Sequence, residues 1–218
     1  MKACIFDLDG TLVNTLESLA HSVDLTLKKM RLPAITTNQC KAFVGDGAKV
    51  LLEKSIEASG GKVEDRIQEA IDIYKGVFDK FCTYHVTAYQ GVENVLLKLK
   101  EEGYILGVLS NKPHPQTIKV VKEVFGEDIF DVVYGQREGM RRKPNPEGLE
   151  KLLHEIGGEK NNCIYIGDSE VDVKTGKNAG VKTIAVTWGF RDEQQLRKAG
   201  ADRMIGIPKE LYLQIKEL

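Results

Sequence analysis

The sequence predicts an α/β fold, a doubly wound parallel Rossmann-like sheet with an inserted helical cap domain. Three observations lead to this prediction. Short runs of continuous apolar residues recur along the chain, as expected for strands that are covered on both faces. Helical patterns alternate with these runs from about residue 91 onward. Between the first run and the second, the chain shows only helical patterns, which indicates an insertion.

Five apolar runs are predicted to be strands: residues 3–6, 104–110, 131–135, 163–167 and 183–189. Three helical patterns lie between them, over residues 91–103, 145–158 and 172–180. In the second of these, Asn145 is expected as the N-cap and Pro146 as the first helical residue, because proline lacks an N–H that this position does not need. The alternation of strands and helices predicts a parallel sheet.

The segment after the first strand is predicted to be a small helical bundle. Its helices are expected over residues 16–30, 37–43, 48–58 and 64–82. In the first of them, Leu19, Val23 and Leu27 fall on one face at helical spacing. We therefore expect two domains: an α/β core of residues 1–14 and 87–218, and a helical cap of residues 15–86.

The composition narrows the class of protein. The chain has 218 residues and a formal charge of −1, which gives no support for binding to nucleic acid or to a membrane surface. No run approaches the roughly 20 apolar residues of a membrane span, and the N-terminus shows no signal-peptide pattern. The cysteines are scattered without CxxC spacing. We expect a cytoplasmic protein, a monomer or weak homodimer.

Polar side chains stand where the predicted strands end. Asp7 and Asp9 follow the first strand in "CIFDLDGTLV", and two acids this close repel each other unless a ligand relieves the repulsion. Further polar residues follow later strands or precede a helix: Ser110 and Asn111, Asp168 and Asp172, and Lys143. Because ligands bind beyond the carboxyl ends of parallel strands, all of these side chains are expected around one crevice.

This set of side chains suits phosphoryl chemistry. Carboxylates are ligands for Mg²⁺, and a lysine with a hydroxyl suits the oxygens of a phosphoryl group. One carboxylate can then act as the nucleophile and form an aspartyl-phosphate. A second acid can protonate the leaving oxygen and later deprotonate water.

Four short motifs resemble those of the haloacid-dehalogenase superfamily of phosphatases. They are "DLDGT" (7–11), "SNK" (110–112), "KPNP" (143–146) and "GDSEVD" (167–172), and they occur in that family's order. The resemblance implies that Asp7 is the nucleophile and a metal ligand. It also implies that Asp9 is the general acid and base, with its backbone carbonyl on the metal. Ser110 and Lys143 resemble the phosphate-binding hydroxyl and lysine.

The remaining positions of these motifs imply supporting roles. Asp168 resembles the second metal carboxylate, and Asp172 resembles an acid that orients the metal shell or Lys143. Thr11 and Asn111 are expected to support the site. The cofactor implied by the resemblance is Mg²⁺.

The helical insertion resembles the cap of the phosphoglycolate phosphatase and β-phosphoglucomutase-like branch. Within it, "VGDGAKVLL" (44–52) is similar to the glycine-containing cap loop of that branch. This likeness makes Gly45, Gly47 and Lys49 candidates for substrate binding. The sequence departs from the family at Asn14, where an aspartate is common, and at Asp46, where Asn is frequent.

Simpler interpretations stand beside these assignments. Gly45 and Gly47 can merely break a helix pair, and Lys49 can be a solvated lysine. Lys112 is interpreted as a solvated lysine and is left out of the catalytic set. Asp172 can be a solvated acid at a helix start, and Ser110 can be a plain cap.

The expected function is that of a Mg²⁺-dependent phosphatase that hydrolyses a small phosphomonoester, of the phosphoglycolate type, through an aspartyl-phosphate. The expected partner is therefore a small phosphorylated metabolite. The alternatives are a β-phosphoglucomutase-like phosphotransferase, a pyrophosphatase and a non-catalytic phospho-acceptor module. A helical lid over the aspartates favours an enzyme, because a phospho-acceptor module needs no lid.

Overall fold

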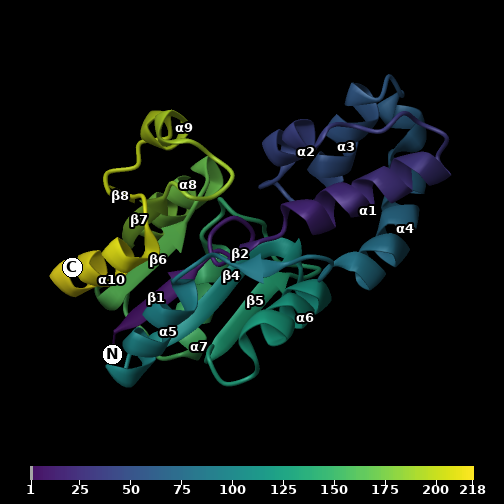
Figure 1. Cartoon of the computed structure of the whole chain (residues 1–218). Helices are drawn as coiled ribbons and strands as arrows, with labels where there is room; N and C mark the ends of the chain where they lie inside the picture. Colours follow the sequence, from purple (N-terminus) through teal and green to yellow (C-terminus); the bar gives the residue numbers. More distant parts are fainter. Residues whose placement is uncertain (1) are drawn as a thin grey trace.

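Six parallel strands form one sheet in the computed structural model, which describes residues 2–218 (Figure 1). The strand order is β5-β4-β1-β6-β7-β8, and every neighbouring pair is parallel. The strands are β1 (Ala3–Phe6), β4 (Ile105–Pro113), β5 (Val132–Gln136), β6 (Cys163–Gly167), β7 (Lys182–Val186) and β8 (Met204–Ile205). The predicted doubly wound parallel sheet is confirmed.

Alternate residues of the strands reach two separate cores. Cys4 and Phe6 of β1 pack in a cluster with residues of several helices, whereas Ala3 and Ile5 pack in a second cluster on the other face. The helices of this domain are α5 (Val92–Glu101), α6 (His114–Phe125), α7 (Glu147–Glu155), α8 (Glu170–Ala179), α9 (Glu193–Lys198) and α10 (Pro208–Glu217), with the short 3₁₀ helix η1 (Lys160–Asn162) before β6. Because helices cover both faces, the strand sequences are continuously apolar.

Four helices stand between β1 and α5 along the chain. They are α1 (Leu16–Lys29), α2 (Thr37–Phe43), α3 (Ala48–Ala58) and α4 (Val63–Phe81), and Figure 1 shows them grouped beside the sheet. Leu19, Val23 and Leu27 are buried, as their helical spacing predicts. The inserted helical cap is thus part of the observed fold. No helix among residues 2–218, α4 included, has the length and apolar character needed to cross a membrane.

Three very short strands are missing from the sequence-based prediction. β2 (Val13–Asn14) and β3 (Thr87–Ala88) pair antiparallel at the two ends of the helical segment, where no strand is predicted. β8 adds to the edge of the large sheet beside β7. A strand of two residues has no apolar period to detect, and its pairing partner is distant in the sequence.

Four helices begin at residues other than those predicted, of which α4 at Val63 and α5 at Val92 differ by one residue. α7 begins at Glu147 and not at Pro146, which is the N-cap residue; the Asn145 side chain accepts a hydrogen bond from the Glu147 N–H at 3.1 Å. α8 begins at Glu170, two residues before the predicted start. The earlier start of α8 places Asp172 inside the first turn of a helix.

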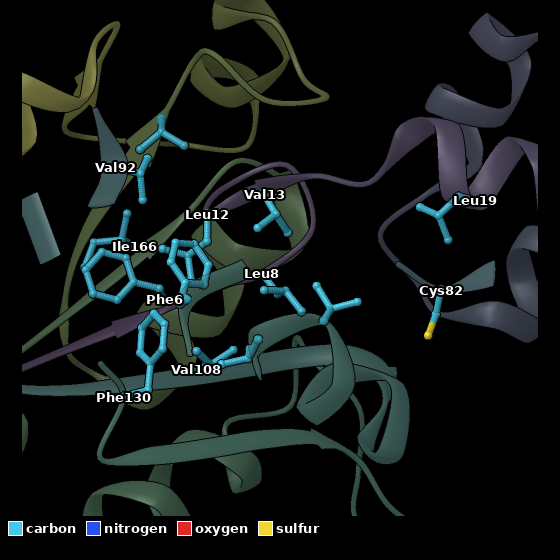
Figure 2. Close-up of a cluster of buried hydrophobic side chains, with 14 of the residues drawn as sticks. Phe6, Leu8, Leu12, Val13, Leu19, Cys82, Val92, Val108, Phe130 and Ile166 are labelled. Carbon is cyan, nitrogen blue, oxygen red and sulfur yellow. The ribbon is translucent and has the colours of Figure 1, made fainter. Parts of the chain in front are cut away.

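The loop after β1 is held in place by two leucines. Leu8 is 0% exposed and Leu12 is 1% exposed. Figure 2 shows both beside Phe6 in the core, while Leu19 of the helical segment lies farther away in the same view. Because Leu8 stands between Asp7 and Asp9, its burial fixes the positions from which both carboxylates emerge.

Candidate active site

The predicted site residues gather at the carboxyl ends of the central strands. The chain runs outward on either side of β1, through β4 and β5 and then through β6 and β7, so a crevice is expected at this edge. A pocket there encloses about 610 Å³ of space, part of it open to solvent. Its lining from the α/β domain includes Asp7, Asp9, Ser110, Asn111, Lys112, Lys143 and Asp168.

Lys143 is the centre of a buried hydrogen-bond network. Its Nζ donates to Asp7 Oδ1 at 2.7 Å, to Asp172 Oδ1 at 2.8 Å and to the Tyr165 hydroxyl at 2.9 Å. The Tyr165 hydroxyl donates in turn to Asp172 Oδ1 at 2.9 Å. All three N–H donors of the ammonium group are therefore used. Among residues 2–218, the second carboxylate oxygen of Asp7 has no hydrogen-bonding partner, and Asp7 lines the pocket.

Asp172 is fixed by the first turn of α8. The Ser169 N–H donates to Asp172 Oδ2 at 3.1 Å and the Asp172 N–H donates to the Ser169 hydroxyl oxygen at 3.3 Å, which forms a capping box at the start of the helix. The Ser169 hydroxyl also donates to Asp172 Oδ2 at 2.5 Å. The residue is 1% exposed, so the interpretation of Asp172 as a solvated acid is wrong. With both oxygens committed, Asp172 orients Lys143 and has little capacity left for a further ligand.

The side chain of Asp168 packs tightly against two glycines. Its Oδ1 accepts from the Thr11 hydroxyl at 3.1 Å, and its Oδ2 accepts from the Phe190 N–H at 2.7 Å. A Cβ on Gly10 would lie 2.3 Å from Asp168 Oδ2, and one on Gly189 would lie 2.4 Å from the same atom. Gly10 also has a φ of 90°. The glycine of "DLDGT" therefore leaves room for a carboxylate that arrives from β6.

Burial and neighbouring charges shift the pKa values of the acids and of the lysine in this cluster. Burial raises the pKa of Asp168 from its ordinary value of 3.8 to about 7, with the charge of Asp172 as the second cause. Burial also raises the pKa of Asp7 well above its usual range, aided by Asp172 and opposed by Lys143. Burial lowers the pKa of Lys143, but the carboxylates of Asp172 and Asp7 outweigh burial and raise it above its usual value.

Replacing Asp168 is expected to stabilise the metal-free protein at alkaline pH. A carboxyl pKa raised from 3.8 to about 7 means that the free energy of unfolding falls between these pH values and stays lower above them. The loss is at most on the order of 4 kcal/mol. In Asp168→Asn, the amide can donate to Thr11 and accept from Phe190. We expect the Tm of the variant in EDTA at pH 8 to exceed that of the parent by several degrees.

The pH dependence distinguishes this effect from ordinary repacking. At pH 4 the Tm difference between parent and Asp168→Asn should become small, because the parent carboxyl is then protonated in the folded state. Asp128→Asn, at an exposed loop position, is the matched control and should leave the Tm unchanged. A lower Tm for Asp168→Asn at both pH values would contradict the burial argument.

Lys112 is buried, and its interpretation as a solvated lysine is wrong. Its side chain is 2% exposed, and its Nζ donates to Asp9 Oδ1 at 3.0 Å and Oδ2 at 3.4 Å. The same Nζ lies 4.7 Å from the centroid of the Phe78 ring of α4, a cation–π contact. Lys112 therefore links the second acid of "DLDGT" to the helical cap.

Asn111 joins the cap to Lys143. Its Oδ1 accepts from the Lys143 N–H at 2.9 Å, and its amide donates to the Lys143 carbonyl at 3.0 Å and to the Gly45 carbonyl at 3.1 Å. The neighbouring Ser110 is 3% exposed, and its hydroxyl oxygen accepts from the Lys112 N–H at 3.2 Å. The "SNK" segment thus places one hydroxyl at the pocket and fixes the backbone of Lys143.

The glycine loop of the cap lies against the pocket. Gly45 and Gly47 line it, and Gly47 precedes α3 with a φ of 90°. Arg191 donates to the Val44 carbonyl at 2.6 Å and holds Glu170 through its Nε at 2.8 Å. Lys49 is not brought to the pocket, because its side chain is 57% exposed and its nearest acid is Glu53 at 3.8 Å.

Comparison with known proteins identifies the family. The family model described as haloacid dehalogenase-like hydrolase matches residues 4–186. The chain belongs to this family. The matched residues include the strand ends that carry Asp7, Ser110 and Asp168, together with Lys143 before α7. The resemblance that the four motifs indicate is therefore confirmed.

Several members of the haloacid dehalogenase-like family are similar over nearly their whole length. The phosphoglycolate phosphatase of Haemophilus influenzae is 31% identical over 203 residues, 90% of each chain. That of Colwellia psychrerythraea is 27% identical, over 99% of this chain and 97% of the relative. A crystal structure of a predicted phosphoglycolate phosphatase from Haemophilus somnus superposes with a TM-score of 0.91 at 26% identity, covering 99% of this chain and 98% of that one. The predicted branch and the predicted enzyme class, a phosphatase, are confirmed.

Sequence reasoning missed four residues of this haloacid dehalogenase-like site. Tyr165 lies inside an apolar strand, and the apolar pattern does not show that its hydroxyl has a polar partner. Lys112 is the last residue of the motif "SNK", near the end of β4, but a single lysine after an apolar run gives no sign of burial. Arg191 follows the last long strand, and only the fold brings it to the cap. Ser169 could have been found, since a serine three residues before an acid is a helix-start signal.

The acidic cluster suits a small divalent cation. One carboxylate oxygen from each of Asp7, Asp168 and Asp172 lies within 4.8 Å of the others, and all three residues are buried. The single ammonium group of Lys143 leaves this cluster short of positive charge. Asp7 and Asp168 have capacity left to hold a cation, whereas Asp172 is committed to Lys143 and to the start of α8. Oxygen ligands of this kind fit Mg²⁺.

Proposed function

We propose that the protein is a Mg²⁺-dependent phosphatase that hydrolyses a small phosphomonoester of the phosphoglycolate type, through a phosphorylated Asp7. The observation that supports this most directly is the geometry of Asp7. Lys143 holds one of its oxygens at 2.7 Å, and the other is left for reaction at the pocket. The phosphoglycolate phosphatases among the relatives support the substrate type.

In the first step, the free oxygen of Asp7 attacks phosphorus, and the bond from phosphorus to the ester oxygen breaks. Asp9 lines the same pocket and donates a proton to the departing oxygen, which leaves as an alcohol. In the second step, Asp9 takes a proton from water, and the water oxygen attacks phosphorus. Inorganic phosphate leaves and the Asp7 carboxylate is restored.

Other residues hold the phosphoryl group during both steps. The Ser110 hydroxyl lines the pocket and donates to its oxygens, and the ammonium group of Lys143, held by Asp7 and Asp172, supplies a positive charge beside them. A cation held by Asp7 and Asp168, with the backbone carbonyl of Asp9, would neutralise phosphoryl charge when bound. Thr11 and Phe190 orient Asp168 for this task.

The cap limits what can reach Asp7. Leu19, Leu51, Tyr74 and Phe78 line the pocket from the cap side. Gly45 and Gly47 complete this wall, and hydrogen bonds from Asn111 and Arg191 hold the loop against the core. An apolar lid of this kind excludes water and favours a compact substrate over a phosphoprotein.

A panel of phosphorylated compounds tests the proposal. Purified protein with Mg²⁺ is given phosphoglycolate, glycerol phosphate, β-glucose 1-phosphate and pyrophosphate, and released phosphate is measured. We expect the highest kcat/KM on phosphoglycolate and loss of activity after treatment with EDTA. Formation of glucose 6-phosphate without free phosphate would replace the phosphatase by a mutase. Phosphate release chiefly from pyrophosphate would also contradict the proposal.

Asp9→Asn is expected to slow turnover by about 10²–10⁴-fold, the usual contribution of general acid and base catalysis. An aryl phosphate needs little protonation of its leaving oxygen, so formation of phosphorylated Asp7 from p-nitrophenyl phosphate should suffer less than from an alkyl phosphate. Single-turnover kinetics with both substrates measure this difference. Equal slowing of the first step with both would contradict an acid role for Asp9.

A further inference from the structure

Lys112 is a buried cation with unused hydrogen-bonding capacity. An ammonium group has three N–H donors. Among residues 2–218, the hydrogen-bonding partner of Lys112 Nζ is the Asp9 carboxylate alone, at 3.0 Å and 3.4 Å. Its other close neighbour is the ring of Phe78, at 4.7 Å from the centroid. At least one N–H is therefore free for a ligand in the pocket that Lys112 lines.

The other two cations that line the pocket are already committed. Lys143 uses its three donors on Asp7, Asp172 and Tyr165. Arg191 uses four of its five N–H donors on Glu170 and on the carbonyls of Lys41 and Val44, so it chiefly holds the cap. Within the described part of the chain, Lys112 is thus the pocket-lining cation beside Asp9 that has a donor left for an additional anion.

The position of Lys112 limits where that anion can lie. If Asp9 contacts the leaving oxygen of the substrate, as in the proposed function, a group bound to Lys112 lies close to the same oxygen, because the two side chains touch at 3.0 Å. A carboxylate on the carbon that carries the ester oxygen meets this condition. A carboxylate several carbons farther away would lie against the apolar wall formed by Leu51 and Tyr74.

We propose that Lys112 is a specificity-determining residue that binds the carboxylate of phosphate esters of 2-hydroxy acids, of which phosphoglycolate is the smallest. This inference rests on the proposed function and names the group that selects its substrate. The side chain is 2% exposed, so the ion pair forms away from bulk water. Charge-assisted hydrogen bonds are stronger in such surroundings than at a surface.

A neutral analogue of the substrate tests the proposal. Phosphoglycolate is compared with its amide, phosphoglycolamide, which has the same shape without the charge, and with 3-phosphooxypropionate, whose carboxylate is one carbon farther away. We expect the parent protein to prefer phosphoglycolate over the amide by about 10- to 100-fold in kcat/KM, the range for one charge-assisted hydrogen bond. In Lys112→Met this preference should fall to within about 3-fold.

The ratio of two substrates on one preparation does not depend on the fraction of correctly folded enzyme, so partial misfolding of Lys112→Met leaves the test valid. Lys29→Met, at an exposed position in the last turn of α1, is the matched control and should keep the parental ratio. If Lys112→Met lowered kcat/KM equally on phosphoglycolate and on its amide, the preference would be preserved. That result would show that Lys112 acts only through Asp9 and would overturn the proposal. Loss of the preference in Lys49→Met instead would overturn it as well.

The outcomes separate this inference from the function on which it rests. Hydrolysis of both esters by the parent without a preference for phosphoglycolate overturns the role of Lys112 and leaves the phosphatase in place. Absence of hydrolysis of every ester overturns both. A parental preference for 3-phosphooxypropionate would place the anion farther from the ester oxygen and contradict the proposed geometry.

Discussion

Asp7→Asn is expected to reduce turnover by at least about 10⁴-fold while the protein remains folded. The amide keeps the shape of the side chain but cannot attack phosphorus. Uncatalysed hydrolysis of phosphate monoesters is among the slowest reference reactions, so little background activity can mask the loss. The measurement is steady-state phosphate release with Mg²⁺, alongside circular dichroism.

The stability of the same variant provides the control. Asp7 is one of three buried acids around Lys143, and burial raises its pKa. Its replacement by a neutral amide should therefore leave the Tm in EDTA at pH 8 unchanged or raise it. Turnover close to that of the parent would contradict the assignment of Asp7 as the nucleophile. A large fall in Tm would contradict the account in which the buried charge of Asp7 destabilises the metal-free protein.

Lys143→Met is expected to have the opposite effect on stability. Lys143 is buried and pairs with Asp7 at 2.7 Å and with Asp172 at 2.8 Å. Removing one partner of a buried ion pair typically costs about 3–5 kcal/mol, because the remaining charges are left without compensation. Unfolding of the metal-free protein by urea at pH 8 should show a loss of this size, together with loss of activity.

Three comparisons test this prediction further. At pH 5 the loss should be smaller, because burial has raised the pKa of Asp7 and that carboxyl can take up a proton. Addition of Asp172→Asn to Lys143→Met should recover part of the stability at pH 8. Lys160→Met, which breaks an exposed pair with Glu150, is the matched control. A loss in Lys143→Met no larger than in this control would contradict the account of the buried network.

The sequence predicts the five longer strands, three helices of the α/β domain and the helical insertion, whereas α6, α9 and α10 are missing from the prediction. The apolar runs predict the five longer strands because both faces of the sheet are covered. The periodic stripe of α1 predicts its buried face at Leu19, Val23 and Leu27. The strand ends also predict the crevice, because parallel strands bring their carboxyl ends to one edge. Local sequence patterns predict strands and helices wherever buried positions recur at a regular spacing along the chain.

The rest depends on contacts that have no local pattern. The pair β2–β3 joins residues that are more than seventy positions apart, and each strand has two residues. Tyr165 reaches Asp172 in α8 and Lys112 reaches Asp9 after β1, so only the completed fold reveals their partners. The sequence allows Asp172 to be a solvated acid, because its burial depends on where α8 begins. Chemistry-bearing motifs could be found from the sequence, but the network that orients them could not.

The central claim is that Asp7 carries the phosphoryl group, and trapping that group tests it most directly. Asp9→Asn is mixed with p-nitrophenyl phosphate and Mg²⁺, because its second step lacks the base that activates water. The reaction is quenched in acid, and the protein is reduced with borohydride, which converts a phosphorylated aspartate to homoserine. Peptide mass spectrometry then locates the change. We predict homoserine at position 7. Phosphate on Ser110, or an unmodified Asp7 during active turnover, would contradict the claim.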